Sequence, residues 1–190
     1  GGEDARVAIE NERPSMYLFP GRQIGTRERL EVLALAVDLP PSNPLPAQDV
    51  VKSILDTGGV PVLSWAPGKW FFGRGRTVRS LVESCLPGGI LLGDTTLRPT
   101  VWPQPALMKL AAARGIGVIA GSDPLPFPGE ERYMGTYATI MRGEFDATKP
   151  LSSARAALLS RGVEFARAGR RCGMFETLER LRKNAGSKTC

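Results

Sequence analysis

Short apolar runs alternate along the chain with amphipathic segments whose apolar residues recur at helical spacing. The run VPVLSW is apolar at nearly every position, which is typical of a strand buried on both faces. The segment before it has Val50, Val51, Ile54 and Leu55 on one helical face, and a Gly-Gly pair follows as a stop signal. We therefore expect strands at residues 60–65, 90–93 and 117–120, and helices at residues 47–57, 77–85 and 105–114.

The alternation of strands and helices predicts βαβ units and a parallel sheet. The loops that follow strands are long, whereas the returns from helix to strand are short (TGG, LPGG and RGIG). This asymmetry favours a (β/α) barrel whose functional face lies at the carboxyl ends of the strands. An open doubly wound sheet fits the same pattern, and periodicity does not separate the two. Residues 29–38 fit either a helix or a strand, and residues 136–141 are a further candidate strand.

The character of the chain changes after Lys149, where we expect two helices at residues 152–160 and 164–184. The net charge of +6 belongs to this end, because residues 1–150 hold 16 basic and 16 acidic side chains, whereas residues 151–190 hold 9 and 3. The sequence thus predicts a barrel domain at residues 1–150 and a basic helical segment at residues 151–190 that packs on it. The second helix has an apolar stripe of Phe165, Ala168, Cys172, Phe175, Leu178 and Leu181.

The chain contains no histidine. Because histidine is the usual general base near neutral pH and the commonest metal ligand, its absence excludes Ser-His-Asp and Cys-His catalysis and zinc sites built on imidazole. The three cysteines are widely spaced and form no CxxC pair, which fits reduced thiols in a cytoplasmic protein. No apolar stretch approaches the roughly 20 residues that cross a bilayer, and the polar, acidic start does not resemble a signal peptide. We therefore expect a cytoplasmic protein without a membrane segment.

Each long loop after a strand carries charged or aromatic side chains that a barrel would bring to one face. Asp94 and Asp123 end two of the strands, and they are the candidate catalytic residues. Arginine and lysine suit phosphate or carboxylate groups, so we expect a small anionic ligand at this face. Turn or cap positions for the two aspartates, and structural ion pairs for Arg98 and Arg132, are the competing interpretation. The candidate ligand-binding residues are Trp65, Lys69, Arg74, Arg98 and Arg132.

Three segments, GGVPVLSWAPGKWFFGRG, ILLGDTTLRP and GIGVIAGSDPLPFPGEE, resemble the later strands and loops of the polymerase and histidinol phosphatase (PHP) family. The resemblance covers residues 17–140 and implies a distorted (β/α) barrel, smaller or incomplete here. It also implies a metal cluster at the strand ends, with phosphoesterase activity in many members. Trp65 stands near a ligand histidine of the family, Asp123 matches the aspartate of its GSDxH strand, and Gln23 stands for a ligand glutamate. The resemblance thus implies a metal site that has lost its histidines.

We expect a PHP-like protein with a degenerate metal site and no cofactor, which binds a phosphorylated or other anionic ligand. One alternative is a phosphoesterase that holds Mg²⁺ or Mn²⁺ with oxygen ligands alone, from Asp94, Asp123 and Glu130 or Glu131. Another is an RNA-associated protein that resembles a ribonuclease P subunit, although the neutral charge of residues 1–150 argues against nucleic acid as a partner. An incomplete barrel would expose a parallel edge, which the N-terminal segment or a second copy of the chain would cover.

Overall fold

The centre of the protein is a five-stranded mixed sheet. The structure is a computed structural model that describes residues 6–10, 13–40, 43–160 and 164–187. β4 runs antiparallel to both β3 and β5, whereas β5, β6 and β7 are parallel. The carboxyl ends of these three strands therefore meet at one edge of the sheet. The strands lie in sequence order, as β3 (Gly21–Gly25), β4 (Glu31–Leu35), β5 (Val60–Ser64), β6 (Leu91–Thr95) and β7 (Val118–Gly121).

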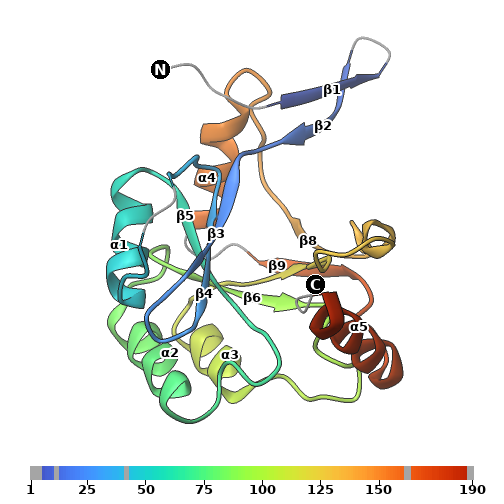
Figure 1. Cartoon of the computed structure of the whole chain (residues 1–190). Helices are drawn as coiled ribbons and strands as arrows, with labels where there is room; N and C mark the ends of the chain where they lie inside the picture. The colour runs from blue at the N-terminus through green and yellow to red at the C-terminus, as the bar shows by residue number, and fades with distance from the viewer. Residues whose placement is uncertain (1–5, 11–12, 41–42, 161–163, 188–190) are drawn as a thin grey trace.

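Two antiparallel strand pairs flank this sheet. β1 (Arg6–Glu10) and β2 (Arg13–Leu18) form a hairpin that extends away from it (Figure 1). β8 (Tyr137–Met141) pairs with β9 (Phe165–Gly169) and lies beside β7. The Thr139 hydroxyl accepts a hydrogen bond from the Ala120 N–H at 2.6 Å and donates one to the Ala120 carbonyl at 3.0 Å. A side-chain hydroxyl thus links β8 to β7 in place of a backbone ladder.

Helices cover both faces of the five-stranded sheet (Figure 1). The larger core cluster packs Ile54, Val78 and Met108, from the first three helices, against one face. A smaller cluster on the other face joins Val60 and Val62 to the fourth helix. The helices are α1 (Ala47–Asp56), α2 (Phe72–Ser84), α3 (Ala106–Ala113), α4 (Pro150–Leu159) and α5 (Met174–Ser187), with a 3₁₀ helix η1 (Glu130–Tyr133).

The strands and helices expected between residues 47 and 121 are confirmed. Every residue of β5 and β6 is buried, as strands covered on both faces must be. α2 begins five residues before the expected start, at Phe72, because the glycine-rich stretch FGRG forms its first turn. The ambiguous segment at residues 29–38 contains strand β4.

The predicted PHP-like (β/α) barrel is wrong. The five-stranded sheet is open, with β3 at one edge and β7 at the other, and no closed barrel forms in the part of the chain that the structure describes. A (β/α) barrel needs parallel strands throughout, but β3 and β4 form an antiparallel hairpin with no helix between them. At the far edge, β8 and β9 occupy the side of β7 where a barrel would continue.

The predicted long helix at residues 164–184 is also wrong. Residues 165–169 form strand β9, and α5 begins only at Met174. Gly169 explains the difference, because its φ of +78° is left-handed and a Cβ there would lie 1.9 Å from the Thr136 carbonyl oxygen. The predicted apolar stripe does not face the core throughout, since Phe175 is 88% exposed and Leu178 is 56% exposed.

Candidate functional site at the carboxyl ends of the parallel strands

The predicted site residues follow the parallel strands. Trp65 directly follows β5, Asp94 lies within β6, and Asp123 lies two residues after β7. Because these strands are adjacent and parallel, the three residues lie along one edge of the sheet. Sequence reasoning thus expected these residues at one face of the fold, and the structure places them along one edge of the sheet, where their contacts differ.

Asp94 and Arg98 form a buried ion pair at this edge. Arg98 donates from Nε to Oδ1 of Asp94 at 2.7 Å and from Nη2 to Oδ2 at 2.6 Å, and its side chain is 2% exposed. The Tyr137 hydroxyl donates to Oδ2 at 3.0 Å. Burial is the main cause that raises the pKa of Tyr137 above its usual value, and the negative charge of the Asp94 carboxylate adds to the rise. Both oxygens of the candidate catalytic Asp94 are thus engaged by internal donors.

Arg98 lies inside the protein, where it holds the loop after β6. Its Nη1 donates to the Trp102 carbonyl at 2.7 Å. Arg171, in the segment between β9 and α5, donates from Nη1 to the same carbonyl at 3.2 Å and to the Pro99 carbonyl at 2.9 Å. Two guanidinium groups therefore fix the segment that carries Trp102.

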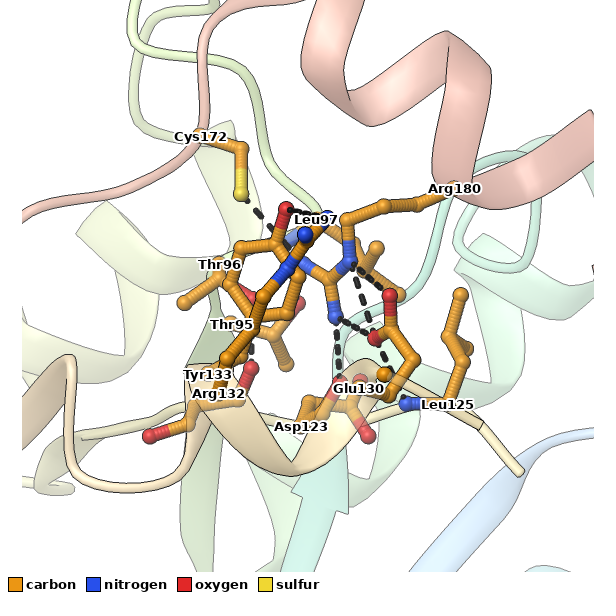
Figure 2. A network of polar contacts seen from close by, with 12 residues as sticks. Thr95, Thr96, Leu97, Asp123, Leu125, Glu130, Arg132, Tyr133, Cys172 and Arg180 are labelled. Atoms are coloured by element: carbon orange, nitrogen blue, oxygen red, sulfur yellow. Dashed lines mark hydrogen bonds and ion pairs between the residues drawn. The ribbon is translucent and has the colours of Figure 1, made fainter. Parts of the chain in front are cut away.

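A second buried ion pair joins α5 to this edge (Figure 2). Arg180 donates from Nε to both carboxylate oxygens of Glu130 at 3.0 Å, and both side chains are almost fully buried. The same guanidinium donates to Thr96 Oγ1 at 2.8 Å and to the Asp123 carbonyl at 3.1 Å. Burial alone would raise the pKa of Glu130, but the hydrogen bonds from Arg180 and from the backbone lower it. Arg180 thus acts as an internal cation where the loops after β6 and β7 meet.

The Asp123 carboxylate receives no hydrogen bond from the described residues. Its backbone φ of 49° is left-handed, a conformation that aspartate tolerates better than most residues. Glu31 and Lys69 form an ion pair and act on this carboxyl by their charges. Burial raises the pKa of Asp123 to about 6, Glu31 adds to the rise, and the positive charges of Arg180 and Lys69 oppose it. Asp123 therefore gains or loses its proton close to neutral pH.

The remaining predicted ligand residues are distributed over the surface. The Lys69 ammonium is paired with Glu31, and Arg74 donates from Nη2 to the Gly68 carbonyl at 2.8 Å. Arg132, in η1, is exposed and donates from Nη2 to the Tyr133 hydroxyl at 3.3 Å, at a pocket of about 480 Å³ beside the start of α5. That pocket is also lined by Tyr133, Thr136, Arg170, Arg171, Cys172, Glu176 and Glu179.

Trp65 lines a different pocket, of about 340 Å³, between the segments that follow β5 and β6. The rings of Trp65 and Trp102 meet edge to face, with centroids 6.1 Å apart, and Phe71 lies 6.3 Å from Trp102. None of the described residues that line this pocket is ionisable. We call it the aromatic pocket, and its lining consists of Trp65, Trp70, Phe71, Trp102, Pro103, Gln104, Pro105, Ala106 and Leu107.

Several hydrogen-bond donors of the aromatic pocket have no acceptor. Trp65 is only 2% exposed, yet its indole N–H has no partner among the described residues. α3 begins at this pocket with Pro105 as N-cap, and no side chain caps the helix. The backbone N–H groups of Ala106 and Leu107, which are the first two of α3, have no hydrogen-bond partner in the described chain either. Free donors at the positive end of a helix favour a ligand that accepts hydrogen bonds and carries negative charge.

The chain matches no protein-family model, and no curated protein matches it. The similarity to the PHP family therefore stays a prediction. None of the described helices has the length and apolar character that a membrane-crossing segment requires. Within the described ranges, His, Cys, Asp and Glu side chains do not gather in threes around a point where a metal ion would sit. The magnesium or manganese alternative thus stays a prediction as well.

Two features of this edge escaped sequence reasoning. Arg180 does not belong to the predicted apolar stripe of the second helix, yet α5 turns Thr177 and Arg180 inward. Nothing in the sequence distinguishes Arg180 from the other basic residues near it. The sequence did contain a signal for the start of α3, namely Pro105. We expected Pro105 to be the first helical residue, whereas it is the N-cap. Ala106 is therefore the first residue of α3, and it lines the pocket.

Proposed function

We propose that the protein binds a small anionic molecule at the carboxyl ends of β5 and β6, in the aromatic pocket. One observation carries this proposal. Three residues of one pocket, Trp65, Ala106 and Leu107, have N–H groups without an acceptor in the described chain, and the described lining of that pocket contains no acidic side chain. An anion at the start of α3 would accept these hydrogen bonds and would be stabilised by the helix dipole.

Two further observations favour binding over metal-dependent hydrolysis. The carboxylates of Asp94 and Glu130 are each neutralised by a buried guanidinium, so neither needs an external cation. Arg98 in turn holds the Trp102 carbonyl, which fixes one wall of the aromatic pocket. In this proposal the residues that sequence reasoning assigned to chemistry act as supports for the pocket.

Titration of isotopically labelled protein, followed by amide chemical shifts in NMR, tests the proposal. Sodium acetate and inorganic phosphate are the probes, with sodium chloride at matched ionic strength as the control for general salt effects. We expect saturable shifts of the Ala106 and Leu107 amides and of the Trp65 indole N–H, which chloride does not produce.

The matched variants are Ala106→Pro, in the pocket, and Ala113→Ser, at the exposed end of the same helix. Proline is well tolerated at the first helical position, and Pro105 already has the extended backbone (φ −55°, ψ 142°) that a following proline requires. Ala106→Pro therefore removes one N–H while the helix remains, and it should weaken anion binding about threefold or more. Ala113→Ser does not touch the pocket and should bind as the parent does. Saturable shifts centred on Lys69, Arg74 or Arg132, with Ala106 unaffected, would contradict the proposal.

A further inference from the structure

The walls of the aromatic pocket also indicate which kind of group accompanies the negative charge of the ligand. Phe71 is 43% exposed and Trp102 is 37% exposed, so two large rings present area that a ligand can cover. Pro103 and Pro105 extend the same apolar surface to the start of α3. Aromatic side chains attract another ring in offset or edge-to-face arrangements, at centroid distances of about 4.5–7 Å.

The size and charge of the pocket limit the anion. Its volume of about 340 Å³ lies at the lower end of the roughly 300–1,000 Å³ of small-molecule pockets, which suits a compound with one ring. Phosphate groups carry close to two negative charges near neutral pH and are bound best by arginine or lysine. The described lining has no such side chain, so a carboxylate with a single charge matches the backbone and indole donors better.

We propose that the ligand of the aromatic pocket is a single-ring aromatic carboxylate. Its ring packs against Trp102 and Phe71, and its carboxylate accepts hydrogen bonds at the start of α3. Trp65 can contribute to both parts of the site, because its ring meets Trp102 edge to face and its N–H has no acceptor among the described residues. This inference rests on the proposed function for the negative charge and adds the aromatic ring.

The protein carries its own reporter for this site. Its three tryptophans are Trp65, Trp70 and Trp102, and all three line the aromatic pocket. A ligand that enters the pocket should therefore change the intrinsic fluorescence directly, with no label attached.

Four probe compounds separate the contributions of ring and charge. Benzoate has both, acetate has the charge without the ring, benzamide has the ring without the charge, and cyclohexanecarboxylate has a saturated ring. We expect a saturable fluorescence change with benzoate, at an affinity about tenfold or more above that of each of the other three compounds.

Two pairs of variants locate the contacts. Ala106→Pro should weaken benzoate binding about three- to tenfold and benzamide binding less, because a neutral amide oxygen is a weaker acceptor than a carboxylate, whereas Ala113→Ser, at the exposed end of α3, should change neither. Trp102→Leu should weaken benzoate binding about fivefold or more, and Trp102→Phe, which keeps a ring, should restore most of it. Circular dichroism confirms that each variant folds, and the comparison of Ala106→Pro with Ala113→Ser decides the matter if Trp102→Leu does not fold.

The outcomes distinguish this inference from the proposed function. Equal affinities for benzoate and acetate, or for benzoate and cyclohexanecarboxylate, would overturn the aromatic ligand and leave the anion site intact. Equal affinities for benzoate and benzamide, unchanged by Ala106→Pro, would overturn the anion site and the inference that rests on it. The absence of a saturable response to all four compounds would overturn both.

Discussion

The guanidinium of Arg180 in α5 contacts the carboxylate of Glu130 in η1, with Nε 3.0 Å from each oxygen. Both side chains are buried, and Arg180 also reaches Thr96 and the backbone of Asp123. This one side chain therefore connects the C-terminal helix to the loops that follow β6 and β7. The stability of the protein should therefore depend on this ion pair.

Replacement of Arg180 by glutamine should destabilise the protein by about 3–5 kcal/mol, because it leaves the carboxylate of Glu130 buried without a partner. The free energy of unfolding in urea, followed by tryptophan fluorescence, measures this. The neighbouring Arg182 is exposed, and Arg182→Gln should stay within about 0.5 kcal/mol of the parent. The paired replacement of Arg180 and Glu130 by methionine and leucine should recover much of the loss. A cost below about 1 kcal/mol for Arg180→Gln would contradict this account of the network.

Asp123→Asn should stabilise the protein increasingly as the pH rises from about 4 to above 6. Burial raises the folded-state pKa of Asp123 to about 6, whereas the unfolded value is about 3.9, so the folded state holds the proton more tightly. The stability that this proton contributes is fully present below pH 4 and is lost as the pH passes 6. Asparagine tolerates the left-handed backbone of this position and has no proton to lose.

Urea unfolding of both proteins across this pH range measures the effect. Because Asp123 is partly exposed, we expect a difference on the order of 1–2 kcal/mol at pH 7 and close to none at pH 4. A difference that is the same at every pH would mean that Asp123 has an ordinary pKa.

Tyr137→Phe should cost about 1–2 kcal/mol, because the hydroxyl donates to the buried Asp94 carboxylate at 3.0 Å. The ion pair with Arg98 remains, so the loss should be smaller than for removal of the cation. Thermal and urea unfolding measure it, and Tyr17→Phe is the control, since the Tyr17 hydroxyl has no hydrogen-bond partner in the described chain. Equal stabilities of the two variants would show that the Tyr137 hydroxyl does not support Asp94.

Gly169→Ala should cost more than about 2 kcal/mol. Its left-handed φ is unfavourable for alanine, and the new Cβ would lie 1.9 Å from the Thr136 carbonyl oxygen. Gly173→Ala is the matched control, since a Cβ there meets nothing within 4 Å and should change stability by less than about 1 kcal/mol. Comparison of the two melting temperatures tests whether Gly169 determines the path of the chain from β9 to α5.

The sequence was informative where burial alone determines the structure. β5 and β6 are apolar on both faces, and VPVLSW identified one of them without any knowledge of the partners. The sequence was less informative about strand direction. The residues of β3 and β4 are equally compatible with parallel strands of a barrel, whereas the structure pairs them as an antiparallel hairpin. The roles of Asp94 and Arg98 also depended on the fold. The four-residue spacing of Asp94 and Arg98 is compatible with an ion pair and with a ligand site. In the structure both side chains are buried at the end of β6, where they form an ion pair.

The network around Arg180 has a consequence for how the chain acquires its structure during synthesis. Arg180 contacts partners that lie 50, 57 and 84 positions earlier in the chain. The ribosome therefore synthesises Thr96, Asp123 and Glu130 well before the cation that they share, and Glu130 is made without its counter-charge. Contacts between residues so far apart in sequence form slowly. The nascent chain should thus remain an incompletely stabilised intermediate until translation passes residue 180, and a stalled or truncated product should be a preferred target of cellular proteases.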